Sequence, residues 1–319
     1  MTSTITPASL RRFVSHTEQT ISPRDVGRLY QRAESLAKLP VPLQKWIVSR
    51  AGGDDYIGFV VEPYAFFLAY EIADEEAANA LLPPDYRLVP TAMFEGTAPR
   101  PAGIICAFNV HSSVFWGSRV ELYLIAENTR TGMLSWLIAD YESNTISYDP
   151  GQGFSGATTL RSVITTTHRG EVVVDVESAE RPNHLSVVAD LGGAATRALD
   201  ERLWIEGNLS VDYAGRLAEP DSTPFGLVFD PAEMDSALDL PLDGVSIGTN
   251  TFGSEWLAAE PFEAACFPYA QHFLTTSFPK ETPIRDRASL ERALREAADL
   301  AADAPVDVVG ERDVVGDRV

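Results

Sequence analysis

Residues 119–141 read RVELYLIAENTRTGMLSWLIADY, and this stretch decides the fold class. Polar and aliphatic side chains alternate over its first six residues, which is the two-residue period of a β-strand. Turn-forming residues 128–132 then separate it from a second apolar run over 133–141. The stretch therefore predicts two strands joined by a short turn.

Comparable segments recur along the chain from residue 56 to residue 273. They are rich in β-branched residues, leucine and aromatic residues, which favours strands. The predicted strands cover residues 59–72, 103–111, 119–127, 133–141, 158–167, 171–178, 184–190, 203–213 and 226–229. Many short strands with few helices predict a mainly β (α+β) protein with an antiparallel sheet, closed into a barrel or folded into a sandwich.

Helical patterns flank this region. Ser22-Pro23 begins one helix that Pro40 ends, a second helix is expected over residues 43–51, and Asp74 caps a short helix over 75–82. Another helix is expected over residues 288–302, where leucine and alanine form one stripe. These patterns predict a helical N-terminal arm (1–54), a β domain (55–275), a linker with a C-terminal helix (276–304) and a disordered tail (305–319).

The charge of the chain excludes some classes of partner. Of its 319 residues, 25 are Lys or Arg and 46 are Asp or Glu, a formal net charge of −21. Such a surface repels phosphate backbones and anionic lipids, so we expect neither a nucleic-acid nor a membrane partner. No apolar run has the ~18–20 residues that a membrane-spanning helix requires.

The two cysteines, Cys106 and Cys266, lie in apolar stretches. This pattern predicts buried, reduced thiols and hence a cytoplasmic protein, an expectation that the absence of a signal-like N-terminus supports. The chain has no CxxC or HExxH motif, and the glycine-rich residues 148–156 carry no lysine. We therefore expect no metal and no cofactor, and we interpret 148–156 as a sharp loop between strands.

Residues 119–125 carry the best candidates for chemistry. One face of this strand holds Arg119, Glu121 and Tyr123, whereas the other holds aliphatic residues. The polar face either meets water or lines a cavity, and the period of the strand is compatible with both. His111 at the end of its strand and His168 in a turn are each solitary, and a structural role is the simpler interpretation of both.

Three stretches together resemble acetoacetate decarboxylase-like proteins: residues 70–83 (YEIADEEAANALLP), 116–121 (WGSRVE), and 225–241 (FGLVFDPAEMDSALDLP) followed by VSI at 245–247. The resemblance covers about residues 56–270. It implies a β-barrel or cone around an apolar cavity, a homo-oligomer, and decarboxylation through a lysine Schiff base. The family's lysine would fall in residues 153–158, which contain none, and its partner arginine would fall near Glu62. Of the family's two cavity carboxylates, one would fall near Cys106 and the other matches Glu121.

We therefore expect a divergent member without imine chemistry, because arginine cannot replace a lysine nucleophile. The expected activity is that of a lyase, hydratase or isomerase acting on a small apolar carbonyl compound or acid. Its expected catalytic residues are Glu121, His111 and Tyr148, and its expected substrate-binding residues are Arg119, Cys106, Trp116 and Phe154. Two alternatives stay open: a non-catalytic binder of an apolar small molecule, and a Schiff-base decarboxylase that uses a relocated lysine (Lys45 or Lys280).

Overall fold

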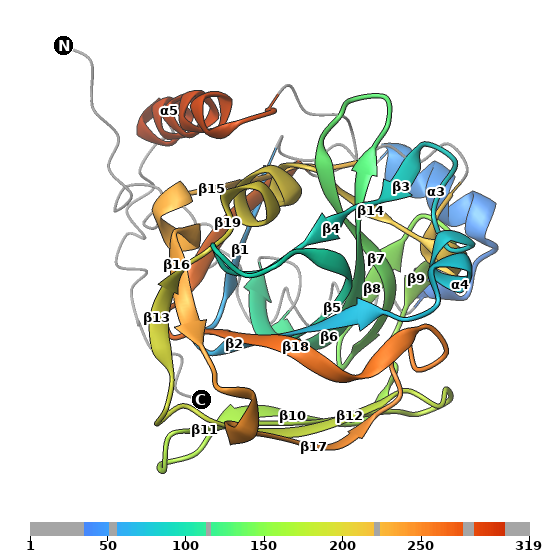
Figure 1. The fold of residues 1–319 in the computed structure, drawn as a ribbon. Coiled ribbons are helices and arrows are strands. Elements are labelled where there is room, and N and C mark those ends of the chain that lie inside the picture. Colours follow the sequence, from blue (N-terminus) through green and yellow to red (C-terminus); the bar gives the residue numbers. More distant parts are fainter. Residues whose placement is uncertain (1–34, 51–55, 113–115, 220–223, 277–283, 304–319) are drawn as a thin grey trace, which may run out of the picture.

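The computed structural model describes residues 35–50, 56–112, 116–219, 224–276 and 284–303. This part of the chain is mainly β, as the sequence predicts, with a 13-stranded sheet, a 4-stranded sheet and a 2-stranded hairpin (Figure 1). The helices are α3 (Val41–Arg50), α4 (Glu75–Asn79) and α5 (Arg287–Asp303). The predicted helix start at Ser22, the boundary at 51–55 and the tail at 305–319 lie outside the described residues.

The 13-stranded sheet, called the main sheet below, consists of β1 (Tyr56–Val61), β2 (Ala65–Ile72), β3 (Tyr86–Leu88), β4 (Pro90–Thr91), β5 (Arg100–Ser112), β6 (Trp116–Asn128), β7 (Leu134–Ser143), β13 (Ala195–Ala198), β14 (Val211–Tyr213), β15 (Leu227–Phe229), β16 (Ser236–Asp239), β18 (Leu257–Phe267) and β19 (Gln271–Thr276). The small sheet consists of β10 (Thr159–Thr166), β11 (Glu171–Ser178), β12 (His184–Asp190) and β17 (Val245–Asn250). The hairpin is β8 (Ser147–Asp149) with β9 (Gly153–Ser155). Single helical turns complete the chain: η1 (Arg202–Glu206), η2 (Gly207–Leu209), η3 (Gly215–Leu217), η4 (Pro231–Met234) and η5 (Leu242–Gly244).

The long strand β5 is the point at which the main sheet divides. One edge of β5 pairs first with β2 and then, nearer its C-terminal end, with β1, while its other edge pairs with β6. Between β1 and β2 the chain turns at Pro63 and Tyr64, and Tyr64 adopts a left-handed φ of 73°. The sheet thus continues along β6, β7 and β14 in one direction and along β1, β19 and β15 in the other.

These two arms of the main sheet curl toward each other. They meet at one isolated bridge between Val211 in β14 and Phe225, two residues before β15. The bridge has two backbone hydrogen bonds of 2.7 and 2.8 Å. No continuous ladder joins the two arms within the described residues, so no sheet closes there and the predicted barrel or cone is not confirmed.

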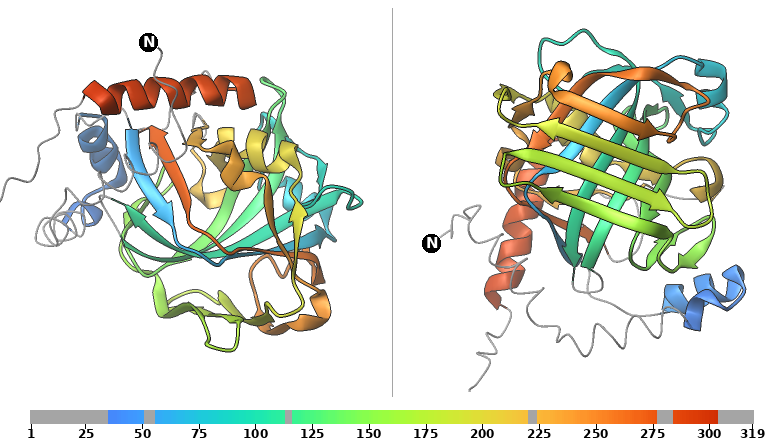
Figure 2. Two further views of the ribbon diagram at one scale, coloured as in Figure 1. Left: turned by 90° about the vertical axis from the view of Figure 1, so that its left-hand side faces the viewer. Right: turned by 90° about the horizontal axis from the view of Figure 1, so that it is seen from below.

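Each face of the main sheet packs against a hydrophobic core. The small sheet lies beneath it, and the outer core between the two sheets contains valines of β11 together with Leu122 and Leu124 of β6 (Figure 2). The inner core lies on the other face, inside the curl, and includes Trp136, Trp204 and Phe267. Helix α5 crosses this inner side, where Leu290 joins the inner core (Figure 2).

Several local predictions are confirmed. Strands β11 and β12 have the predicted ends, and Asp74 caps α4 by accepting a 3.0 Å hydrogen bond from the Ala77 amide. The strand predicted over 203–213 is confirmed for residues 211–213, which form β14, and is wrong for the residues before them, because residues 202–209 form a π-helix and a 3₁₀ turn. Leu203, Trp204 and Ile205 are all buried, and a buried apolar run of this length has no period that separates helix from strand.

Candidate functional site

The polar face of β6 points into the inner core. Tyr123 packs against inner-core residues, whereas Val120, Leu122 and Leu124 on the opposite face belong to the outer core. Arg119 and Glu121 share the face of Tyr123, because they are four and two residues before it. The side chains of Arg119 and Glu121 are only 13% and 7% exposed. Of the two interpretations that the sequence permits, the solvated face is therefore excluded.

Both carboxylate oxygens of Glu121 accept hydrogen bonds. The Arg119 guanidinium reaches Oε1 through Nε at 2.7 Å and Nη2 at 2.6 Å, and the Tyr123 hydroxyl donates to Oε2. Burial opposes the charge on Arg119, but Glu121 outweighs this and the pKa of Arg119 lies above its ordinary value. The same burial, reinforced by the Glu121 carboxylate, raises the pKa of Tyr123, which therefore stays a proton donor.

The predicted residues Cys106 and Glu121 are brought together. Cys106 in β5 lies opposite Glu121 in β6, and it belongs to the inner core. Burial, followed by the negative charge of Glu121, raises the pKa of the Cys106 thiol well above its ordinary value. The thiol of Cys106, next to the Glu121 carboxylate, is therefore neutral at neutral pH.

A bulge in β7 supplies the other side of the cluster. Leu122 pairs with Asp140 but Tyr123 pairs with Ile138, so β7 carries one extra residue there. An extra residue reverses the alternation of a strand. Consequently Tyr141 faces inward, opposite Glu121, and its ring centre lies 4.7 Å from the Arg119 guanidinium carbon.

The β8–β9 hairpin adds three polar side chains that the sequence analysis did not select. Ser147 Oγ accepts a 2.8 Å hydrogen bond from Arg119 Nη1. The Tyr141 hydroxyl donates to Asp149 Oδ2 at 3.1 Å and lies 3.2 Å from Ser155 Oγ. Burial raises the pKa of Asp149, although hydrogen bonds oppose the shift.

Helix α3 holds this hairpin in place. Gln44 of α3 is buried, and its Oε1 accepts a 2.8 Å hydrogen bond from the Phe154 amide. Gly153, with a φ of 79°, provides the left-handed turn and leaves room for that oxygen. Residues 148–156 are thus a hairpin rather than an anion-binding loop.

Two other predicted residues, Tyr148 and Phe154, pack on each other with ring centres 4.9 Å apart. Ser147 and Asp149 are buried and Tyr148 lies between them in the strand, so its side chain projects to the opposite side. The structure therefore keeps the Tyr148 ring apart from Glu121. It brings a neighbour, Asp149, to the cluster in its place.

His111 also lies apart from Glu121. It is five residues after Cys106 in β5, which places it on the opposite face of that strand, and its Nε2 pairs with the Glu62 carboxylate. The His111 side chain is 38% exposed. Trp116 is opposite His111 in the β5–β6 ladder; only its backbone is described.

Tyr213 completes the cluster and was also missed. It ends β14, which pairs in parallel with β7, and its hydroxyl is 3.4 Å from the Tyr148 carbonyl oxygen. Burial raises the pKa of Tyr213; Arg119 lowers it, while Glu121 and Asp149 raise it further. A three-residue strand that pairs in parallel with a distant strand has no recognisable pattern in the sequence. For this reason Tyr213 was not among the predicted site residues.

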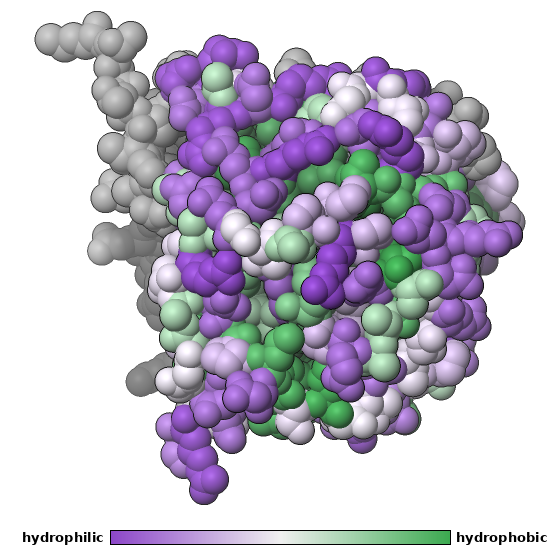
Figure 3. Space-filling model, in the orientation of Figure 1, coloured by the Kyte–Doolittle hydropathy of each residue, from purple (hydrophilic) through white to green (hydrophobic). Residues whose placement is uncertain are grey.

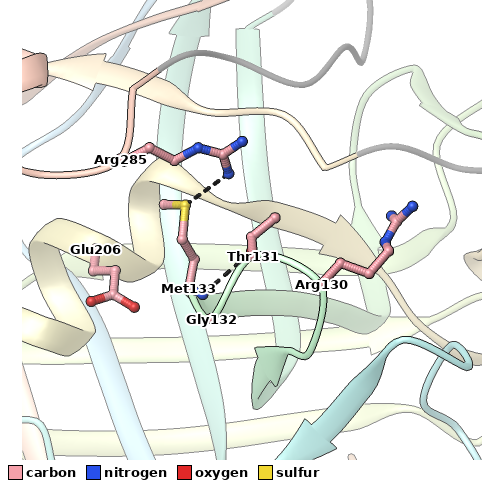
Figure 4. Close-up of a pocket in the computed structure, with 6 residues that line it drawn as sticks. All are labelled: Arg130, Thr131, Gly132, Met133, Glu206 and Arg285. Atoms are coloured by element: carbon pink, nitrogen blue, oxygen red, sulfur yellow. Dashed lines mark hydrogen bonds between the residues drawn. The ribbon is translucent and has the colours of Figure 1, made fainter.

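Surface hollows lined by described residues lie away from this cluster. One, of about 690 Å³, is lined by Arg130, Thr131, Gly132, Met133, Glu206 and Arg285 (Figure 4). The other, of about 230 Å³, lies near β4 and Arg202. Hydrophilic residues dominate the face in Figure 3, and apolar side chains show between them. No group of three or more His, Cys, Asp or Glu side chains in the described ranges is arranged to hold a metal ion.

Comparisons with known proteins give little further information. In the described part of the chain no helix is long and apolar enough to span a bilayer. No protein-family model matches the sequence, and no curated protein matches it. Among solved structures, the chain is similar to acetoacetate decarboxylase from Legionella pneumophila, with 12% identity and a TM-score of 0.43, over 76% of this chain and 96% of that one.

Proposed function

We propose that the inner-face cluster around Glu121 is an acid–base site for a small, largely apolar carbonyl compound or acid. The protein would act as a lyase, hydratase or isomerase, as a divergent acetoacetate decarboxylase-like protein without the imine-forming lysine. One observation carries the proposal: a buried carboxylate lies between a guanidinium and a hydroxyl inside an aromatic core. Buried ionisable groups with specific charge partners are typical of catalytic sites.

The two carboxylate oxygens of Glu121 have different partners and therefore different proposed roles. Arg119 binds Oε1 of Glu121 and fixes the carboxylate, while Oε2 is bonded to the hydroxyl of Tyr123. Oε2 is the atom that exchanges a proton with the substrate, and Tyr123 moves aside to donate to the substrate oxygen. The raised pKa of Tyr123 suits a donor that is never ionised at neutral pH. Arg119, which is bonded to Glu121, and Cys106, which lies opposite Glu121 in β5, are the substrate-binding residues of this proposal.

Two of the predicted catalytic residues are replaced in this proposal. His111 and Tyr148 project away from Glu121, so Asp149 and Tyr213 replace them in this proposal as the second proton-transfer groups. Phe154 and Trp116 remain predictions from the sequence. Assembly as a homo-oligomer and a cytoplasmic location also remain predictions.

A non-catalytic binder is the second candidate. The observation that favours it is that the charged groups of the cluster already have hydrogen-bond partners. The Glu121 carboxylate and the Arg119 guanidinium bond to each other. A carboxylate whose oxygens already accept hydrogen bonds within the core fits a structural or ligand-holding role. The aromatic side chains around it, including Trp136 and Tyr213, would then contact an apolar ligand.

A relocated lysine is the third candidate. Lys45 of α3 pairs with Glu219, Lys38 is exposed, and Lys280 lies outside the described residues. Borohydride trapping with acetoacetate or pyruvate, followed by peptide mass spectrometry, tests for an imine. A covalent adduct on any lysine would overturn the acid–base proposal.

The first experiment is native mass spectrometry of the purified protein to identify a bound compound. Turnover and binding of that compound are then compared between wild type and Glu121→Gln, with Glu127→Gln on the same strand as control. Loss of turnover by about 100-fold or more with binding retained supports the enzyme. Tight binding by both proteins without turnover by wild type supports the binder.

A further inference from the structure

The cluster around Glu121 combines one buried guanidinium with two buried carboxyl groups. Glu121 and Asp149 are 5% and 1% exposed, and the side chain of Arg119 is 13% exposed. Burial raises the pKa of Asp149, although hydrogen bonds and the charge of Arg119 oppose the shift. Whether or not Asp149 holds its proton, the positive charge of Arg119 is already balanced by Glu121. The cluster therefore has no excess positive charge.

Arg119 has a partner at each of its three guanidinium nitrogens. Nε and Nη2 lie 2.7 and 2.6 Å from Glu121 Oε1, and Nη1 donates a 2.8 Å hydrogen bond to Ser147 Oγ. The guanidinium carbon lies over the Tyr141 ring, 4.7 Å from its centre. A bidentate pair with a substrate carboxylate would require Arg119 to leave Glu121. Arg119 is thus engaged by the protein itself.

Neighbouring cations in the described ranges have carboxylate partners of their own. Arg181 and Arg216 both pair with Asp140, whose side chain is on the face of β7 that points away from the inner core. Lys45 of α3 pairs with Glu219. A substrate carboxylate would thus meet like charge at the cluster and would have to displace one of these existing pairs. Burying a charge without such a partner is costly.

The uncharged donors of the cluster suit a different ligand. The Tyr123 hydroxyl donates to Glu121 Oε2, and burial raises the pKa of Tyr123, so the hydroxyl keeps its proton at neutral pH. The Trp136 ring packs edge to face on Tyr123, with ring centres 5.0 Å apart. A carbonyl oxygen accepts a hydrogen bond from a hydroxyl without adding charge and needs no cation. A neutral carbonyl compound therefore matches these surroundings.

We propose that the site around Glu121 selects neutral carbonyl compounds, such as ketones and oxo amides, and excludes oxo acids. This inference rests on the proposed function and narrows its substrate class. In it, Arg119 neutralises Glu121 and does not bind a substrate carboxylate. Like charges brought together in a site with little water repel strongly, so an oxo acid is rejected by Glu121. Removing the charge of Glu121 would release Arg119 and reverse this preference.

Matched compounds that carry either a carboxylate or a carboxamide test the proposal. The pairs are 2-oxobutanoate with 2-oxobutanamide, and 4-oxopentanoate with 4-oxopentanamide. In D₂O, wild type should exchange protons next to the ketone of at least one amide about tenfold or more faster than those of the matched acid, after the rate in buffer is subtracted.

The possible results separate this inference from the proposed function. A ratio below about tenfold, or faster exchange of the acid, overturns the inference; the acid–base function stands if that exchange still depends on Glu121. No exchange of any of the four compounds by wild type overturns both.

Binding measures the effect of the Glu121 charge without any need for turnover. In isothermal titration, Glu121→Gln should bind the acids about tenfold or more tightly than wild type, because Arg119 is released, and the amides with little change. Glu127 on the same strand pairs with Arg87 and Arg202, so Glu127→Gln removes an equal charge outside the cluster and should bind like wild type.

Thermal unfolding confirms that both variants are folded. Unchanged acid binding in Glu121→Gln, or an equal gain in Glu127→Gln, overturns the proposal. If Glu121→Gln does not fold, the exchange ratio of wild type decides alone.

Discussion

The guanidinium carbon of Arg119 lies 4.7 Å from the ring centre of Tyr141, across neighbouring strands of the main sheet. This contact depends on the bulge in β7, which turns Tyr141 rather than Asp140 toward the inner core. On the other face, Asp140 pairs with Arg181 and Arg216. Because of the extra residue in β7, Tyr141 contacts Arg119 on the inner face, whereas its neighbour Asp140 forms ion pairs on the other face.

The first prediction concerns the buried pair. Glu121→Leu leaves the Arg119 charge without its carboxylate and should lower the free energy of unfolding by about 3–5 kcal/mol. The double variant Arg119→Met/Glu121→Leu should recover most of that loss, because it removes both charges. Urea unfolding of both proteins measures this. Equal stability of Glu121→Leu and wild type would show that the pair is not buried as described.

The second prediction concerns pH. Burial raises the pKa of Asp149 above its ordinary value of 3.8. The folded state thus holds that proton more tightly than the unfolded state, so the contribution of Asp149 is fully present below pH 3.8 and is lost as pH rises through the folded pKa. Asp149→Asn, which has no such proton, should gain stability relative to wild type as the pH rises above 3.8 toward neutral. Urea unfolding across this range is the measurement, and a difference that stays constant or reverses contradicts the shift.

The third prediction concerns the hairpin that carries Asp149. A methyl group at Gly153 would lie 2.4 Å from Gln44 Oε1, and the φ of 79° is left-handed. Gly132 has a similar φ of 72° but nothing within 4 Å. Gly132→Ala should therefore cost only backbone strain, about 1–2 kcal/mol, and Gly153→Ala should cost more. Thermal unfolding compares them, and equal losses would contradict the packing of Gln44 on this turn.

The fourth prediction concerns the thiols. Cys106 lies opposite Phe67 in the inner core, whereas Cys266 lies opposite Phe66 in the outer core, so the sheet separates the two sulfurs. Burial raises the pKa of Cys266 to about 12 and that of Cys106 well above its ordinary value. A thiol-specific reagent at pH 7 should label neither in the native protein and both in guanidinium. Rapid labelling of Cys106 at pH 7 without denaturant would contradict the raised pKa of its thiol.

The sequence predicted the parts of this site that follow local periodicity. Alternation in β6 placed Arg119, Glu121 and Tyr123 on one face, and the apolar context of Cys106 predicted its burial. It did not predict Tyr141, because the bulge that turns it inward has no local signature. Tyr213 depends on long-range parallel pairing. The direction of His111 and Tyr148 follows from strand registers that only the folded chain reveals.

The prediction of the fold was likewise accurate only where local sequence patterns determine the structure. Strands with alternating patterns, such as β11, were found with their ends, whereas the uniformly apolar residues 203–205 were assigned to a strand although they lie in a π-helix. The resemblance in three sequence stretches suggested a closed barrel. Closure depends on how β14 meets the segment before β15, which is a tertiary property, and a single bridge joins them.

Proton exchange at carbon tests the central claim most directly. Small ketones and 2- and 3-oxo acids are incubated in D₂O with wild type, Glu121→Gln or Glu127→Gln, and deuterium incorporation next to the carbonyl is followed by proton NMR. The acid–base account predicts exchange of at least one compound by wild type and Glu127→Gln, and a rate lower by about 100-fold or more with Glu121→Gln. Equal exchange by Glu121→Gln and wild type, or no exchange of any compound by wild type, would contradict it.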